Sequence, residues 1–121
     1  MEVIRGKVRR GASRGKKLGY PTANLALHKK IEQGIYVSIT KIDGKNYNSV
    51  TFLGNATTFN EKKVFVETHI FKFDKNIYNK WIAISLIKKI RDNKKFNNAR
   101  GLKEQMKKDI EIAKKYFKEN V

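Results

Sequence analysis

The chain has 121 residues, no cysteine and a formal net charge of +17. This length suits one compact domain rather than two, and the lack of cysteine excludes disulfides and thiolate metal sites. Because 40% of the residues are hydrophobic, the chain is neither a disordered polycation nor a disulfide-stabilised miniprotein. No apolar run approaches the roughly 20 residues of a membrane span and no signal peptide opens the chain. We therefore expect a cytoplasmic protein with no membrane partner.

The positive charge is concentrated at the two ends of the sequence. Residues 1–30 have a net charge of +8 and residues 88–121 one of +7, whereas residues 31–87 have only +2. Two binding roles fit this distribution: a surface for a nucleic acid, or a lining for a compact polyphosphate ligand. A third interpretation is that the lysines only fill solvent-facing positions.

Alternating apolar and polar residues predict five strands, over residues 3–9, 35–42, 47–53, 64–73 and 81–91. A tight turn is expected at Asp43-Gly44-Lys45, because glycine readily adopts the positive φ that such a turn needs. Most aromatic residues follow the strand alternation or the stripe of the helix described next, which is typical of a core.

The apolar spacing changes to three and four residues near the C-terminus, which predicts an amphipathic helix. Its stripe consists of Leu102, Met106, Ile110, Ala113 and Phe117. Asn97 or Asn98 is the expected N-cap. Strands followed by one helix indicate a mostly β fold, a closed antiparallel barrel with the helix packed alongside.

A glycine-rich cationic segment follows the first predicted strand. It contains Gly11 and Gly15, with Lys16 and Lys17 directly after them. Backbone N–H groups at glycines can approach phosphate oxygens closely, and lysine adds positive charge. The segment is not a P-loop, because three residues instead of four separate the two glycines and no Ser or Thr follows the lysines.

Pro21, the only proline, fixes its own φ and favours an extended backbone before it. Thr22 and Asn24 are two residues apart, so in an extended segment their side-chain oxygens point the same way. Two neutral oxygens beside a cationic loop can help to hold Mg²⁺, which takes phosphate oxygens and water as its other ligands. The alternative is that both side chains only satisfy local backbone groups.

Glu67 lies in an otherwise apolar predicted strand, where alternation places it on one face with Phe65 and His69. A carboxylate that shares a face with phenylalanine must be solvated, paired or functional. From the residues alone, a surface position and a site position are both open.

Several of these motifs together resemble the signature of riboflavin kinases (flavokinases). The resemblance covers practically the whole chain in register. It is carried by Gly6, Val8, Gly11, Gly15, the run LGYPTANL at residues 18–25, Gly34-Ile35-Tyr36, Val66-Glu67-Thr68-His69-Ile70, Tyr78, Ile90-Arg91, Lys95-Phe96 and residues 102–109. The Pro-Thr-Ala-Asn run together with Glu-Thr-His is a specific combination.

The resemblance implies a six-stranded antiparallel Greek-key β-barrel with a C-terminal helix, residues 20–27 supplying the sixth strand. It implies transfer of the γ-phosphoryl group of ATP to the 5′-hydroxyl of riboflavin, giving FMN and ADP. Glu67 then matches the catalytic acidic residue, and Thr22 and Asn24 the residues that hold Mg²⁺. Nucleotide contacts are expected at Gly11, Gly15, Lys16, Pro21, Thr22 and Asn24. Arg91 is expected to contact substrate, with flavin recognition around residues 92–106.

Two segments depart from the family pattern. Phe52-Leu53-Gly54 and residues 56–59 replace Asn-Ile-Gly and Arg-Pro-Thr-Phe, and Asp92-Asn93 replaces a Pro-Glu pair. We expect one kinase domain over residues 1–121, with riboflavin and ATP as partners, no nucleic acid and a monomeric state. The adenylyltransferase domain of bifunctional relatives does not fit in this length, and both a stand-alone kinase and the C-terminal module of a bifunctional enzyme stay open. Two alternatives stay open, a basic RNA-binding barrel and a family member that binds flavin or nucleotide without turnover.

Overall fold

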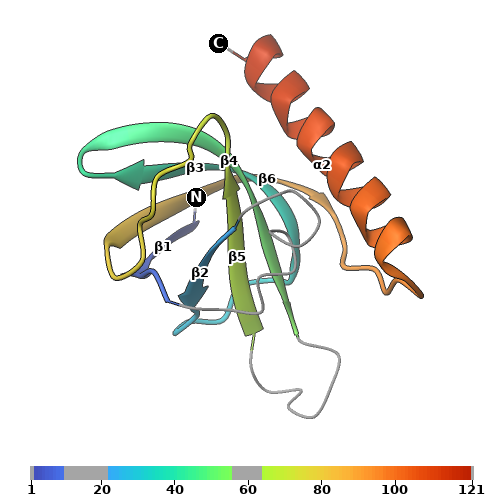
Figure 1. The fold of residues 1–121 in the computed structure, drawn as a ribbon, viewed down its shortest axis with the longest axis horizontal. Helices are drawn as coiled ribbons and strands as arrows, with labels where there is room; N and C mark the ends of the chain where they lie inside the picture. Colours follow the sequence, from blue (N-terminus) through green and yellow to red (C-terminus); the bar gives the residue numbers. More distant parts are fainter. Residues whose placement is uncertain (1, 10–21, 56–63, 121) are drawn as a thin grey trace.

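The computed structural model describes residues 2–9, 22–55 and 64–120, which form six strands and a C-terminal helix (Figure 1). The elements are β1 (Glu2–Lys7), β2 (Ala23–Ala26), β3 (Gly34–Ile42), β4 (Lys45–Asn55), β5 (Val64–Ile70), β6 (Trp81–Arg91) and α2 (Ala99–Glu119). Neighbouring strands pair antiparallel in the order β1-β6-β3-β4-β5-β2. The two end strands contact each other, and Arg9 bridges to Asn24, so the sheet is a nearly closed barrel.

This topology confirms the expected fold class. Strands β3, β4 and β5 follow one another, and β6 returns beside β3, which is the Greek-key arrangement. The sixth strand is β2, within the segment from which it was expected. The turn between β3 and β4 has positive φ at both Asp43 (49°) and Gly44 (79°), the combination that suits a two-residue hairpin.

Two strands are shorter at their C-terminal ends than the sequence predicted. The strand expected over residues 64–73 ends at Ile70, because the chain turns away at Lys72, whose φ is +55°. The first strand ends at Lys7, although Arg9 still makes its isolated bridge. Asn98 is the N-cap of α2, and its side-chain oxygen accepts a hydrogen bond from the Gly101 N–H at 2.9 Å.

The barrel interior contains an apolar core and, beside it, a row of hydrogen-bonded hydroxyl groups. Ile4, Leu25, Leu53, Val66 and Ile84 are among the core residues. Hydrogen bonds link five fully buried hydroxyls: Ser38 to Ser49 (2.7 Å) and to Thr51 (2.7 Å), Thr40 to Ser49 (2.9 Å), and Thr51 to Thr68 (3.0 Å). Every one of these hydroxyls has a partner, so their burial carries no desolvation penalty from an unmade bond.

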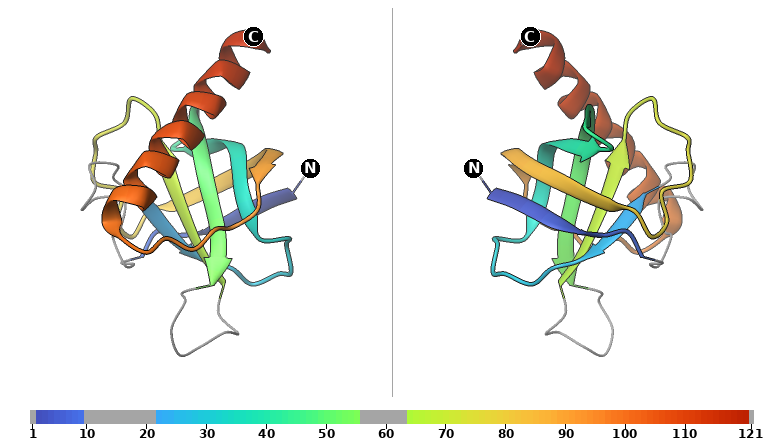
Figure 2. Two further views of the ribbon diagram at one scale, coloured as in Figure 1. Left: turned by 90° about the vertical axis from the view of Figure 1, so that its right-hand side faces the viewer. Right: turned by 90° about the vertical axis from the view of Figure 1, so that its left-hand side faces the viewer.

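Helix α2 lies against the outer face of β3 and β4, as the left view of Figure 2 shows. Its Ile110 and Ala113 pack with Val37 and Val50, and the predicted stripe is buried at Met106, Ile110 and Ala113. In the described part of the chain, no helix is both long and apolar enough to cross a membrane. Helix α2 thus covers the barrel at β3 and β4. The candidate site lies on β5 and β2, the next two strands of the sheet.

Candidate active site

Glu67 and Asn24 face each other across two paired strands. Asn24 in β2 is directly opposite Glu67 in β5, and opposite residues of an antiparallel pair project on the same side of the sheet. Their chain neighbours Leu25 and Val66 are buried in the core, so both polar side chains belong to the outer face. Phe65, 39% exposed, also lies on this face, as the alternation predicted.

Thr22 precedes β2 and contributes an unusual hydroxyl. Its Oγ1 is buried and has no hydrogen-bond partner among the residues that the structure describes. Buried hydroxyls in proteins normally have such a partner. The alternative interpretation, in which the Thr22 hydroxyl bonds a nearby backbone group, is not supported by any hydrogen bond among the described residues. Asn24, 9% exposed, follows two residues later. A donor set of one hydroxyl, one amide oxygen and phosphate oxygens fits Mg²⁺.

The described residues hold no group of three or more His, Cys, Asp or Glu side chains that would bind a metal alone. Any metal beside Thr22 and Asn24 would therefore take most of its negative ligands from the nucleotide. The remaining nucleotide-contact predictions, at Gly11, Gly15, Lys16 and Pro21, lie outside the described residues.

Arg91, at the end of β6, is held by the terminal helix. Its Nε and Nη2 donate to the two carboxylate oxygens of Asp109 at 2.9 and 2.7 Å, and Nη1 donates to the Asp92 carbonyl at 2.9 Å. Asp109 is fully buried and also accepts from Gln105 Nε2 at 3.0 Å. Such a bidentate pair fixes orientation as well as charge, so Arg91 joins the barrel to α2. Its predicted substrate contact stays a prediction.

The contact of Asp109 and Gln105 with Arg91 was not predicted from the sequence. A signal was present, because Asp109 lies beside Ile110 in the apolar part of α2, where Met106 and Ala113 are also buried. A carboxylate in such a position needs a cationic partner.

The two segments that depart from the family pattern contact each other. Asn93 Nδ2 donates to the Leu53 carbonyl at 2.9 Å and to Gln33 Oε1 at 3.2 Å. A Cβ on Gly54 would come within 2.8 Å of the same Asn93 nitrogen. The segment at residues 52–54 and the change at residue 93 therefore meet in one contact, whereas residues 56–59 lie outside the described residues.

A second ionic cluster joins the end of β6 to the segment before β3. Lys89 Nζ lies 2.6 Å from Glu32 Oε1 and 2.5 Å from Asp92 Oδ1. The hydrogen bond from Lys89 lowers the pKa of Asp92, and the bonds to Asp92 and Glu32 raise the pKa of Lys89. Burial, followed by the charge of Glu32, raises the pKa of Tyr36.

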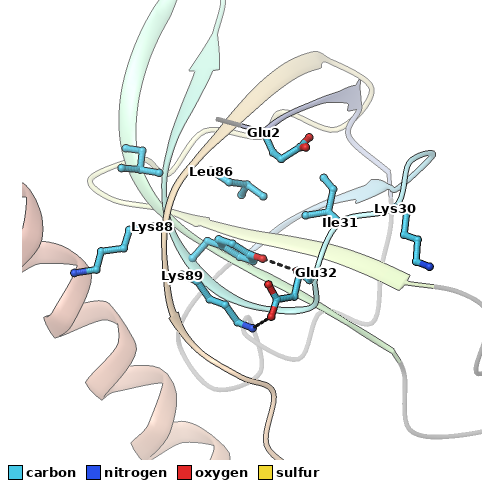
Figure 3. A pocket seen from close by; sticks show the side chains of 9 residues that line it. Glu2, Lys30, Ile31, Glu32, Leu86, Lys88 and Lys89 are labelled. Atoms are coloured by element: carbon cyan, nitrogen blue, oxygen red, sulfur yellow. Dashed lines mark hydrogen bonds and ion pairs between the residues drawn. The ribbon is translucent and has the colours of Figure 1, made fainter.

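A cavity of about 280 Å³ opens beside this cluster (Figure 3). Its lining includes Glu2, Lys30, Leu86 and Lys88, and the Tyr36 hydroxyl beside it donates to the Glu32 carbonyl at 2.5 Å. None of Thr22, Asn24 and Glu67 lines it, so we do not assign it to the site on β2 and β5.

Comparison with known proteins identifies the family to which this sequence is similar. A family model described as "Flavokinase: Riboflavin kinase" matches residues 2–117. A bifunctional riboflavin kinase/FMN adenylyltransferase of Buchnera aphidicola is 41% identical over 94% of this chain and 38% of its own length. An RNA-binding riboflavin kinase of Bacillus subtilis is 32% identical over 97% of this chain and 52% of its own length. The chain spans less than two fifths of the first curated relatives that it matches, from 18% to 38%.

Two solved structures share the fold. A macrolide-efflux protein from Streptococcus pneumoniae superposes with a TM-score of 0.82 at 33% identity, over 93% of this chain and 38% of that chain. A riboflavin kinase from Trypanosoma brucei superposes with a TM-score of 0.65 at 22% identity, over 96% of this chain and 79% of that chain.

Proposed function

The chain belongs to the riboflavin kinase family, and from this premise we propose that it transfers the γ-phosphoryl group of ATP to the 5′-hydroxyl of riboflavin, giving FMN and ADP. One observation of the structure carries the assignment of the site. Glu67 lies opposite Asn24 on the outer face of β2 and β5, and the nearby Thr22 hydroxyl is buried without a described partner. The Glu67 carboxylate suits the role of proton acceptor, and the Asn24 amide and Thr22 hydroxyl suit that of neutral metal ligands.

Phosphoryl transfer depends more on positioning and charge neutralisation than on covalent chemistry. In the proposed reaction the Glu67 carboxylate accepts the proton of the riboflavin 5′-hydroxyl while that oxygen bonds to the γ-phosphorus. The bond from the γ-phosphorus to the bridging oxygen breaks, and ADP leaves with its electron pair. Mg²⁺, when bound, supplies positive charge that balances the phosphate oxygens.

The chain's own residues hold the reactants in this proposal. Thr22 and Asn24 present neutral oxygens toward the metal side of the nucleotide, and Pro21, directly before them in the sequence, contacts the nucleotide. Gly11, Gly15 and Lys16 contact the phosphates through backbone N–H groups and one ammonium group. Arg91 orients the flavin side of the site through the N–H groups that its contacts with Asp109 and Asp92 leave.

The same proposal covers the organisation of the molecule. Residues 1–121 act as one kinase domain and as a monomer in the cytoplasm, and the kinase reaction itself needs neither nucleic acid nor a membrane. Excess ATP with riboflavin should therefore yield FMN and no FAD. An FAD peak in chromatography of the products would contradict the single-domain assignment.

The decisive experiment is incubation with riboflavin, ATP and Mg²⁺, followed by chromatographic separation of the flavins. Glu67→Gln keeps the shape of the side chain and removes the proton acceptor, so FMN formation should fall about 100- to 10,000-fold. Glu111→Gln, at an exposed position of α2, is the matched control and should retain the rate.

Three results would count against the proposal. The first is no FMN formation by the unchanged protein, and the second is FMN formation that is equally fast with Glu67→Gln. Quenching of riboflavin fluorescence with no product would instead indicate a family member that binds flavin without turnover. Circular dichroism of the variants checks that any loss of rate is not a loss of fold.

A further inference from the structure

Trp81 is the only tryptophan of the chain, and 69% of its surface is exposed. It begins β6, directly opposite Lys7 of β1. The right view of Figure 2 shows β1 and β6 on the near side of the barrel with α2 behind them. This is an exception to the expectation that aromatic residues lie in the core, and so is Tyr78, which is 47% exposed.

Basic residues surround the indole on the same outer face. Arg5 of β1 is opposite Ala83 of β6, and Ala83 is opposite Lys41 of β3, so two cations flank one small residue. Their neighbours Ile4, Ile42 and Ile82 are buried in the core. By alternation, Arg5, Lys7, Lys41 and Trp81 therefore project outward. We call these four residues the Trp81 face.

Among the described residues, no acidic side chain forms an ion pair with the cations of the Trp81 face. None of the seven ion pairs formed between described residues involves Arg5, Lys7 or Lys41. Asp43, in the turn directly after β3, pairs with Lys80 at 2.6 Å. Glu2, also in β1, pairs with Lys29 at 3.1 Å and by alternation is on the same side of the strand as the buried Ile4, opposite to Arg5 and Lys7.

A second exposed aromatic residue is fixed near the end of β1. The N–H of Val8 donates to the Lys80 carbonyl, and the N–H of Asn79 donates to the Val8 carbonyl, both at 2.9 Å. These bonds tie the segment that carries Tyr78 to the strand that carries Lys7. Two exposed aromatic residues, Trp81 and Tyr78, thus lie on segments joined to the strand that carries Arg5 and Lys7.

We propose that the Trp81 face binds single-stranded nucleic acid, with a base stacked on the indole and backbone phosphates on Arg5, Lys7 and Lys41. Single strands combine these two features, because their unpaired bases offer π faces and their phosphates a row of negative charge. The carboxylates of an acidic protein partner would match the cations but would not themselves stack on the exposed indole, whereas a single strand supplies both kinds of group. The face lies on β1, β6 and β3, away from Thr22, Asn24 and Glu67 on β2 and β5. The inference thus goes beyond the kinase reaction and does not depend on it.

The single tryptophan allows a direct test. Titration of the full chain with a 12-nucleotide oligouridylate, and separately with oligothymidylate, should quench the intrinsic fluorescence of Trp81. Contacts to three or four phosphates predict that affinity falls about 20- to 50-fold between 50 and 200 mM salt. Stronger binding of one oligonucleotide would distinguish RNA from DNA as the preferred strand.

Variants locate the site by the anisotropy of a labelled oligonucleotide. Trp81→Ala should weaken binding at least 10-fold, and Lys7→Ala should weaken it and reduce the salt slope by about 0.7. Lys107→Ala removes the same charge at an exposed position of α2 and should change the affinity less than 2-fold. FMN formation should be unaffected by Trp81→Ala.

Three outcomes would overturn the proposal. Equal losses with Lys7→Ala and Lys107→Ala would show attraction by net charge alone. Binding by anisotropy without quenching of Trp81 would place the nucleic acid elsewhere. Quenching by polyglutamate but not by either oligonucleotide would indicate an acidic protein partner.

Discussion

Thr22 carries the least usual group of the candidate site, a buried hydroxyl with no described hydrogen-bond partner. Leaving such a group unsatisfied costs about 1–3 kcal/mol. Thr22→Val removes the oxygen and keeps the shape, so the free energy of unfolding should stay the same or rise. If Thr22 is a metal ligand, FMN formation should fall at least 10-fold and need more Mg²⁺. Urea unfolding and a Mg²⁺ titration of the rate measure both effects.

The two measurements separate the two roles of Thr22. A variant that loses stability and keeps its Mg²⁺ dependence would show that the hydroxyl serves only local structure. Thr22→Ser, which keeps the oxygen, is the matched control and should retain most of the activity. An unchanged rate with Thr22→Val would remove this residue from the proposed metal site.

Arg91 and Asp109 connect two elements, β6 and α2, through a bidentate contact at 2.7 and 2.9 Å. Asp109 is fully buried and the Arg91 side chain is only 20% exposed. Asp109→Ala leaves the guanidinium without its carboxylate, which should lower the free energy of unfolding by about 3 kcal/mol. Urea unfolding followed by circular dichroism measures the loss, with the exposed Glu111→Ala as control. A change below 0.5 kcal/mol (about the scatter for surface substitutions) would contradict this anchoring role.

The Lys89 cluster joins the segment before β3 to the end of β6 and should depend on pH. The pKa of Asp92 is lowered from 3.8, so its contribution is present above that value and is lost as pH falls through the folded-state pKa. The pKa of Lys89 is raised from 10.5, so its contribution is complete below that value and is lost at higher pH. The cluster therefore stabilises the fold between these limits.

Lys89→Met should accordingly be less stable than the unchanged protein at pH 7. The difference should shrink as pH falls below 3.8, because protonated Asp92 no longer attracts Lys89. Urea unfolding of both proteins at constant ionic strength and several pH values tests this. A difference that is as large at pH 3 as at pH 7 would show that Lys89 acts through packing rather than through its charge.

The elements differ in how far the sequence predicts them. The alternation around Glu67 and the spacing of Thr22 and Asn24 place these residues on one face, because strand periodicity is a local property. The register that sets Asn24 opposite Glu67 depends on β2 pairing with β5, more than 40 residues away in sequence. The Arg91–Asp109 contact likewise requires knowing where α2 crosses the barrel. Strand ends were the least predictable, since Lys72 turns the chain at a residue with no glycine or proline signal.

At the scale of the whole molecule, a net charge of +17 on 121 residues opposes the compact state. Within residues 2–9, 22–55 and 64–120, ion pairs engage only Lys29, Lys80, Lys89, Arg91, Arg100 and Lys115, so much of the repulsion between the other cations of these ranges is unbalanced. Salt shortens the range of this repulsion, from a Debye length of about 30 Å at 0.01 M to about 8 Å at 0.15 M. We therefore expect added salt to stabilise the fold, although it weakens any contact of the Trp81 face with phosphates.

Raising sodium chloride from 10 to 150 mM should increase Tm by about 4 °C, which corresponds to roughly 1 kcal/mol for a domain of this size. Calorimetry without nucleotide measures the shift. Sodium sulfate at the same ionic strength separates screening from anion binding, because screening gives similar shifts with both salts and a phosphate-like site favours sulfate. A constant or falling Tm would mean that the cations lie too far apart to repel one another strongly. The positive charge would then impose little cost on folding, and its concentration on particular faces would matter for binding alone.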